Sequence, residues 1–393
     1  MVRYTVLDSW RGICACLVVL LHVPSHGYVL GSPLVQNAYL FVDYFFVLSG
    51  FIMATTYGDR IASAADARRF MLLRFARVYP LHVAVLAAFV LYEIAVFASR
   101  SITVGDTQNA FRDQYDPYAL LTNLLLVHSL NTENELTWNI PSWSISVEFY
   151  TYLLFALVTL FWRRFTAAIV AGVLLVSPFL IGWISPTNME VTYDWGIIRC
   201  VFGFCAGMAV HRLLNGRPGL AAAARRRPTV MTLIELATVA GIGLFVHHAG
   251  TGRLSLLAPY VFALSVFVFA LEGGAVSRAL RSPLPVLVGT LSYSIYMIHW
   301  LIVKGVEHVV RAVDRITVTM MNPIVEMYGE PMRVWGPVPW QSDLIGLAVL
   351  LLVIAVSFVS YHTLERPARR AIRAWAEKRH GRRFAVEDPK GAP

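Results

Sequence analysis

The sequence predicts an all-α integral membrane protein, a bundle of about ten transmembrane helices with both termini in the cytoplasm. Three observations predict this. Of the 393 residues, 57% are apolar and only 15% are charged, whereas about 25% of residues are charged in ordinary soluble domains. The mean hydropathy is +0.60. Long apolar runs recur along nearly the whole chain. A soluble fold and a disordered chain are therefore both excluded.

Ten apolar stretches reach the roughly 17–25 residues that a spanning helix needs. In chain order they are 7–28, 38–57, 78–99, 143–162, 166–184, 196–213, 230–248, 255–272, 285–306 and 343–363. An eleventh candidate, 118–130, has an apolar core too short to cross a bilayer. We therefore expect a re-entrant or interfacial segment there. Residues 1–366 form the predicted membrane domain, and residues 367–393 form a basic cytoplasmic tail.

The basic residues orient the bundle. With ten spans and a cytoplasmic N-terminus, the great majority of the 33 lysines and arginines fall in cytoplasmic loops and in the tail, as the positive-inside bias requires. If 118–130 crossed the membrane, Arg163, Arg164 and the basic tail would lie outside. The net charge of +9 therefore fits a multi-pass protein of the cytoplasmic (inner) membrane, with no nucleic-acid partner. The four cysteines lie inside apolar runs and predict no metal site.

Several ionisable side chains interrupt the spans. Such residues are costly in a bilayer and often functional. With the expected topology, His22, Asp43, Glu148 and His299 all lie roughly 8–10 Å below the outer boundary, at 1.5 Å of rise per residue. A histidine near carboxylates is the arrangement that general-base catalysis uses. Buried packing with a local hydrogen-bond partner is the alternative interpretation of each residue.

A second group lies at the expected cytoplasmic face. Arg74 and Arg77 are three residues apart and share one helix face. Arg11 lies near the same surface, about 16 Å below His22 on the same helix face. Guanidinium groups suit a phosphorylated ligand, although basic residues also flank spans for topological reasons alone. The two groups together suggest a phosphate-bearing donor that binds inside and reaches a base near the outer face.

At these positions the chain resembles acyltransferase family 3, the integral-membrane acyltransferases of bacteria and animals. The resemblance is carried, in the family's order, by LDSWRG at 7–12, VDYFFVLSGFIM at 42–53, RFARVYPL at 74–81, WNIPSWSISVEFYTYLLF at 138–155, SYSIYMIH at 292–299 and YHTLERPARR at 361–370. It implies a ten-span bundle that uses cytosolic acyl-CoA, commonly acetyl-CoA, to acylate carbohydrate hydroxyls.

The resemblance also implies roles for individual residues. His22, with Asp43 and Glu148, would be catalytic. Donor binding would involve Arg11, Arg74, Arg77, Tyr293 and His299. Apart from the resemblance, contacts to the acceptor are expected from Arg199, Trp143, Trp335 and Trp340. The last two belong to a long outer segment, 307–342, which we expect to cap the acceptor entrance; an interfacial aromatic belt is its alternative interpretation.

The predicted function is therefore membrane O-acylation, most simply O-acetylation, of an extracytoplasmic carbohydrate or glycolipid acceptor, as in exopolysaccharide or oligosaccharide modification. The partners are acyl-CoA, that acceptor and the lipid bilayer. A proton-coupled secondary transporter is the alternative, since intramembrane histidine and carboxylates also serve proton relays. No internal repeat, which many transporters carry, is evident, and transport does not explain the arginine pair. A structural scaffold explains none of the aligned charges.

Overall fold

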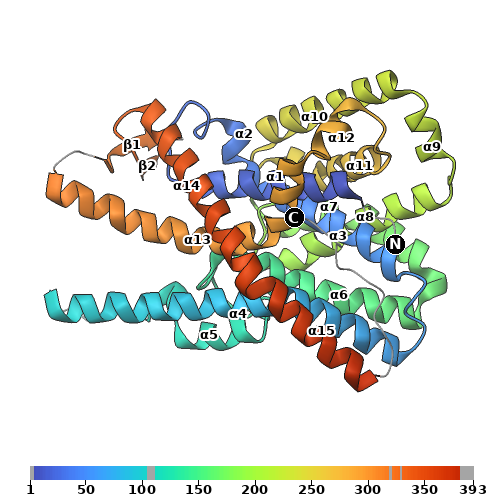
Figure 1. The fold of residues 1–393 in the computed structure, drawn as a ribbon, viewed down its shortest axis with the longest axis horizontal. Coiled ribbons are helices and arrows are strands. Elements are labelled where there is room, and N and C mark those ends of the chain that lie inside the picture. The colour runs from blue at the N-terminus through green and yellow to red at the C-terminus, as the bar shows by residue number, and fades with distance from the viewer. Residues whose placement is uncertain (1–3, 104–110, 318–320, 328–329, 381–393) are drawn as a thin grey trace.

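The computed structural model describes residues 4–103, 111–317, 321–327 and 330–380. Over these residues the chain is almost entirely helical, with the long helices laid roughly side by side (Figure 1). The long helices are α1 Thr5–Leu21, α3 Phe41–Tyr57, α4 Ala64–Thr103, α6 Trp143–Phe161, α7 Thr166–Ile184, α8 Gly196–Asn215, α10 Pro228–Ala249, α11 Ala258–Ala270, α13 Pro283–Thr317 and α14 Pro339–Ser360.

These helices confirm the predicted all-α membrane bundle. Among the described residues, nine helical segments are long and apolar enough to cross a membrane. Helix α1 contains 17 residues, which is the lower limit for a spanning helix of about 17–25 residues, and the tenth span stays a prediction. The shorter helices are α2 Pro33–Gln36, α5 Pro117–Leu124, α9 Leu220–Arg225, α12 Ala275–Leu280 and α15 Arg366–His380.

The first span ends earlier than the sequence predicts. We expected a helix over 7–28, but α1 stops at Leu21 and His22 is its C-cap residue. The reason is Pro24, because a proline disfavours helical geometry at the residue that precedes it. His22 therefore lies at the end of its helix, beside an irregular segment, and not one or two turns inside a span.

The segment 118–130 does not cross the bundle. Helix α5 has only 8 residues, about 12 Å at 1.5 Å per residue, and the chain then turns back without regular structure. Side chains bind the carbonyl groups at its end: Ser146 donates to Leu126 O at 2.6 Å and His82 Nε2 lies 2.9 Å from Asn123 O. The expectation of a short non-spanning segment is confirmed.

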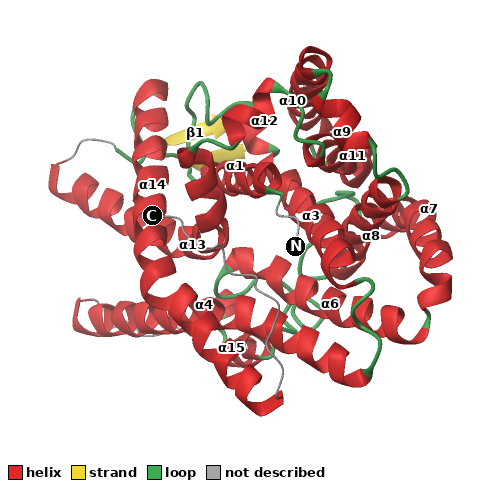
Figure 2. Ribbon diagram, turned by 45° about the vertical axis from the view of Figure 1, so that its right-hand side comes forward, coloured by secondary structure: helices red, strands yellow, loops and turns green. Residues whose placement is uncertain are grey.

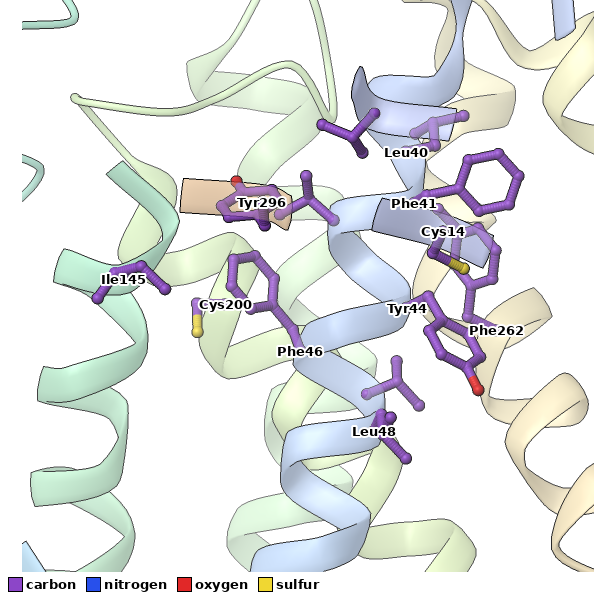
Figure 3. Packing of buried hydrophobic residues seen from close by; sticks show 14 of the residues in the cluster. Cys14, Leu40, Phe41, Tyr44, Phe46, Leu48, Ile145, Cys200, Phe262 and Tyr296 are labelled. Atoms are coloured by element: carbon purple, nitrogen blue, oxygen red, sulfur yellow. The ribbon is translucent and has the colours of Figure 1, made fainter. Parts of the chain in front are cut away.

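Glycines allow two helix pairs to approach closely. A Cβ on Gly50 of α3 would lie 1.9 Å from Phe204 O of α8, and a Cβ on Gly12 of α1 would lie 2.5 Å from Gly289 N of α13. Small residues are the usual means of close helix packing in membranes. Around these contacts a continuous apolar core forms from α1, α3, α6, α8, α11 and α13. Figure 3 shows part of it, with Tyr44, Phe46, Ile145, Cys200, Phe262 and Tyr296.

The outer segment 307–342 extends one helix and adds a hairpin. Helix α13 continues to Thr317, and strands β1 Ile324–Met327 and β2 Glu330–Arg333 pair antiparallel (Figure 2). Residues 318–320 and 328–329 lie outside the described residues. After the hairpin, Trp335 N donates to Pro24 O at 2.9 Å. This bond ties the outer segment to the loop that follows His22.

The last span continues without a break into the C-terminal helix. Between α14 and α15 the residues Tyr361–Glu365 form one π-helical turn. Such turns are rare and often occur at functional sites. Glu365 is 4% exposed and accepts a hydrogen bond from Ser294 of α13 at 2.7 Å. The start of α15 is therefore held against the bundle.

Candidate active site

A cavity of about 390 Å³ opens among α1, α3, α4, α6, α13 and the π-helical turn Tyr361–Glu365. Its lining includes the first turns of α1, the last turns of α3 and Arg369 of α15, at the side where α1 begins. The charge distribution predicts that this side is cytoplasmic. Toward the opposite side the cavity ends near Phe45, Ser144 and Tyr296. Its polar lining includes Asp8, Arg11, Ser49, Arg74, Arg77, Glu148, Tyr152, Ser292, Tyr293, Glu365 and Arg369.

The arginine pair of α4 lines this cavity, as the i,i+3 spacing indicates. Arg74 is only 2% exposed, and its guanidinium lies 5.4 Å from the ring of Tyr57 and 5.9 Å from that of Tyr152. It also donates to the Tyr57 hydroxyl at 3.3 Å. Arg77, one turn further, is half-buried. Aromatic rings thus hold Arg74 in place, while Arg77 is the more accessible of the two.

Arg11 lines the cavity from the opposite wall. Its Nε donates to the Ser292 hydroxyl at 2.7 Å, and its Nη2 donates to Gly289 O at 3.2 Å. Asp8, one turn earlier on α1, lies 3.3 Å away. These contacts fix the side chain across the α1–α13 interface. The structure therefore brings Arg11, Arg74 and Arg77 to one cavity, as the sequence predicts.

Glu148 joins this cavity and does not join the histidine. It accepts a hydrogen bond from the Tyr152 hydroxyl at 2.7 Å, and that hydroxyl is also 2.9 Å from Ser49. The predicted grouping of Glu148 with His22 is wrong in this respect, because equal depth on two helices does not place their side chains face to face. Tyr293, expected at the donor site, also lines the cavity, and its hydroxyl donates to Val78 O.

His22 instead pairs with His299. Their ring centroids lie 4.9 Å apart, and His299 is fully buried. The register of α1 and α13 explains this: Gly12 and Gly289 touch, and ten residues further along each of these parallel helices stands one of the two histidines. His299, expected at the donor cavity, is not among the residues that line it.

Backbone hydrogen bonds set the tautomers of both rings. His22 Nδ1 lies 2.8 Å from Val18 O, and His299 Nδ1 lies 2.6 Å from Tyr296 O. A carbonyl oxygen only accepts, so Nδ1 carries the proton and Nε2 carries the lone pair in each neutral ring. His22 is partly accessible, and its Nε2 is thereby available as a proton acceptor.

Aromatic side chains separate the cavity from the histidine pair. Tyr296 lines the deep end of the cavity, far from its opening. Its ring lies 5.9 Å from that of His299 and 5.6 Å from that of Phe45. On the other side of His22, the Trp300 ring lies 5.5 Å away, with the Lys304 ammonium 4.8 Å from that indole. The deep end of the cavity is therefore one aromatic ring away from the histidine pair.

The structure pairs Asp43 with Arg199. Asp43 does not contact His22: its two carboxylate oxygens accept hydrogen bonds from Arg199 at 2.9 and 2.8 Å. Both side chains are almost completely buried. Arg199 also donates to the carbonyl oxygens of Tyr39 and Val191 and lies 5.3 Å from the Trp143 ring. With these partners, Asp43, Arg199 and Trp143 form a buried structural cluster between α3, α6 and α8, outside the cavity.

The two outer tryptophans differ from each other in exposure. Trp335 is only 1% exposed and packs in an apolar cluster with Val19, Val23 and Leu30, so its ring has no free face. Trp340 is 55% exposed, at the first turn of α14. Trp335 therefore holds the outer segment over the end of α1.

We expect the Trp335→Leu variant to lose about 1–3 kcal/mol of stability, less than full truncation of a buried aromatic residue costs. The Trp340→Leu variant is the matched control and should unfold at the wild-type temperature, because its ring is exposed. Thermal unfolding of the two purified variants measures the difference. Equal melting temperatures would show that Trp335 does not anchor the segment.

Some residues of the site were not singled out from the sequence. Tyr152, Ser292, Glu365 and Arg369 all line the cavity. Glu365 and Arg369 belong to the ERPARR run that follows the last span. The sequence pattern that could have identified them is a carboxylate at the end of an apolar stretch, followed by four arginines with helical spacing.

Comparison with known proteins shows similarity to acyltransferases. The family model described as an acyltransferase domain matches residues 4–362. Protein 2 in the picA locus of Rhizobium radiobacter is 32% identical over 159 residues, which is 39% of this chain and 81% of that protein. The acyltransferase MdmB of Streptomyces mycarofaciens is 26% identical over 332 residues, which is 77% of this chain and 80% of that protein. No solved structure matches the chain significantly.

Proposed function

The chain belongs to acyltransferase family 3, whose domain model covers residues 4–362, and from this premise we propose that it moves an acyl group from cytosolic acyl-CoA to a hydroxyl of an extracytoplasmic carbohydrate or glycolipid. That it is a multi-pass membrane acyltransferase follows from the family and from its apolar helices. The thioester donor, most simply acetyl-CoA, the carbohydrate acceptor and the inner-membrane location are the proposed parts.

One observation carries the proposal: the arginine-lined cavity ends at Tyr296, whose ring lies 5.9 Å from that of His299, the partner of His22. An acyl-CoA has phosphates at one end and a thioester at the other end of a long, narrow arm. Arg11 lies eleven residues before His22, a separation of about 16 Å along a helix. The arm can therefore enter between the arginines and carry its thioester toward His22.

The proposed reaction needs one base and no further cofactor. His22 Nε2 removes the proton from the acceptor hydroxyl while the hydroxyl oxygen attacks the thioester carbonyl. The new C–O bond forms, the C–S bond breaks, and the thiolate takes the proton from the His22 imidazolium. Products are the acyl ester and the free thiol, so atoms and charges balance. General-base catalysis of this kind typically contributes about 10²–10⁴-fold.

The remaining polar groups suit binding and positioning. Glu148, Tyr152 and Ser49 lie along the cavity wall, where hydrogen bonds to the amides of the donor arm would orient it. Trp300 and Lys304 lie on the outer side of His22. Flat aromatic faces backed by a polar group are suited to sugar rings. We propose this pair as part of the acceptor site.

The direct test is incubation of membranes that contain the protein with radiolabelled acetyl-CoA. Label should pass to a carbohydrate or glycolipid fraction, and mass spectrometry of the surface glycans should show the acyl mass only in cells that produce the protein. A proton-coupled transporter would neither bind acetyl-CoA nor consume it. Absence of both donor binding and label transfer would refute the proposed acyl-CoA chemistry.

Arg77 should contribute directly to donor affinity. A hydrogen bond to a charged group is typically worth about 1.5–3 kcal/mol, so we expect the Arg77→Ala variant to bind coenzyme A about 10–100-fold more weakly. Arg77→Lys keeps the positive charge but loses the planar guanidinium, so its affinity for coenzyme A should lie between those of the wild type and Arg77→Ala. Calorimetric titration of purified protein measures these values.

The matched control for Arg77 is Arg212→Ala, an exposed arginine at the end of α8 on the same side of the bundle. Its affinity for coenzyme A should equal that of the wild type, because Arg212 does not line the cavity. If both variants lost affinity equally, the effect would belong to the general positive surface charge and not to Arg77.

A further inference from the structure

We propose that α15 and α4 form a second anion subsite at the mouth of the cavity, which binds the terminal phosphate monoester at the nucleotide end of the donor. This inference rests on the proposed acyl-CoA donor and assigns the location of one part of it. The residues concerned are four arginines of α15, Arg366, Arg369, Arg370 and Arg373, together with Arg77 of α4.

The spacing of these arginines places them on one helix face. Positions 366, 369, 370 and 373 follow the i, i+3, i+4, i+7 pattern, which gathers side chains into a single stripe along a helix. The stripe turns toward α4, because all four arginines line a small hollow of about 40 Å³ together with Leu73, Ala76 and Arg77.

The hollow adjoins the donor cavity. Arg77, Tyr361 and Arg369 line both spaces. The donor cavity also contains the carboxylates of Asp8, Glu148 and Glu365, whereas five arginines line the hollow at its mouth. Clustered like charges repel one another, and an anion bound among them relieves that repulsion.

The hollow is built on a rigid support. Glu365, the last residue of the π-helical turn, is buried and bound to Ser294 of α13. Arg369 lies one helical turn further, with its guanidinium 3.6 Å from the Glu365 carboxylate. The π turn and this pair fix where α15 leaves the bundle, so the arginine stripe has a defined position against α4.

A phosphate monoester fits this hollow best. Such a group carries about −1.5 to −2 charges at neutral pH and offers three strong acceptor oxygens, and guanidinium groups bind phosphate oxygens in pairs. Coenzyme A bears one monoester, on the 3′ oxygen of its ribose. The headgroup of an anionic lipid offers similar chemistry, but a helix that binds the membrane surface buries its apolar face and leaves its basic residues free to contact the headgroups. Here the basic face turns toward α4.

The test compares two ligands that differ only in this group. Full-length protein in detergent micelles is titrated calorimetrically with coenzyme A and with 3′-dephospho-coenzyme A. The wild type should bind coenzyme A about 10–100-fold more tightly, the range expected for hydrogen bonds between charged groups. The double variant Arg370→Gln/Arg373→Gln should bind both ligands with the affinity that the wild type shows for the dephospho form.

The control is Arg226→Gln/Arg227→Gln, which removes the same charge from an exposed loop on the same side and outside the hollow. It should keep the full discrimination between the two ligands. If the α15 variant loses affinity for both ligands by one common factor, the arginines act on another part of the donor and the subsite is refuted.

Two further outcomes separate the possible causes. The wild type and the Arg370→Gln/Arg373→Gln variant are also titrated with coenzyme A and with 3′-dephospho-coenzyme A in nanodiscs with and without anionic lipid. If the variant keeps its discrimination and loses only a response to anionic lipid, the stripe is a lipid site and the inference is overturned. If the wild type binds both ligands equally, only this inference fails. If it binds neither, the proposed acyl-CoA donor fails as well.

Discussion

Replacement of His22 by alanine is expected to lower the rate of acyl transfer by about 10²–10⁴-fold, the usual contribution of a general base. Its Nδ1 donates to Val18 O within its own helix, so the lone pair on Nε2 is the basic site. The measurement is transfer of label from acetyl-CoA to the acceptor fraction. Affinity for coenzyme A should not change, because His22 does not line the donor cavity.

His22→Gln provides the matched control for packing. Glutamine can fill much of the space beside Trp300 but supplies no base, so its activity should fall as far as that of the alanine variant. Both variants should melt within a few degrees of the wild type, since His22 is a partly accessible residue at a helix end. Activity within a few-fold of wild type in either variant would exclude His22 as the base.

The second large effect concerns the stability of the fold. Asp43→Ala leaves the Arg199 guanidinium buried without its carboxylate, and removal of one partner of a buried ion pair typically costs about 3–5 kcal/mol. We therefore expect a sharply lower yield of folded protein and a lower melting temperature in detergent. Donor affinity of the surviving folded protein should be close to that of the wild type, because neither side chain lines the cavity.

A double variant distinguishes a structural pair from a catalytic carboxylate. Replacement of a whole buried ion pair by apolar residues is often neutral or stabilising, so Asp43→Leu/Arg199→Met should recover much of the stability that Asp43→Ala loses. A structural pair also predicts recovery of acyl transfer in the double variant. Recovery of folding without recovery of activity would assign Asp43 a direct role in the reaction and contradict the structural interpretation.

The two halves of the site follow from one interface. Close contact of Gly12 with Gly289 aligns α1 and α13. At that level Arg11 binds Ser292 and Gly289 O, and ten residues further along the two helices His22 meets His299. One parallel helix pair thus connects the arginine-lined cavity with the proposed base. A side chain larger than hydrogen at either glycine would separate both contacts together.

Much of the fold could be predicted from the sequence, because hydropathy is a local property. A run of apolar residues specifies a spanning helix whatever its neighbours are, and the loop charges orient the bundle. The same reasoning identified 118–130 as too short to cross and placed Arg74 and Arg77 on one helix face. The end of α1 was misjudged, because Pro24 stops the helix before the apolar run ends, and α4 begins at Ala64, well before the predicted span 78–99.

The partners of the polar residues were decided by the tertiary structure alone. Sequence gives the depth of a residue along its helix, through the rise of 1.5 Å per residue, but it does not give which helices are neighbours or how each is rotated. His22, Asp43 and Glu148 were therefore expected to meet. The packing of α1 on α13 brings His22 next to His299, and the packing of α3 on α8 brings Asp43 next to Arg199. The rotation of α6 about its axis turns Glu148 into the cavity. Depth is a local quantity that hydropathy encodes, whereas helix neighbours are set by contacts between glycines and side chains that lie far apart in the chain.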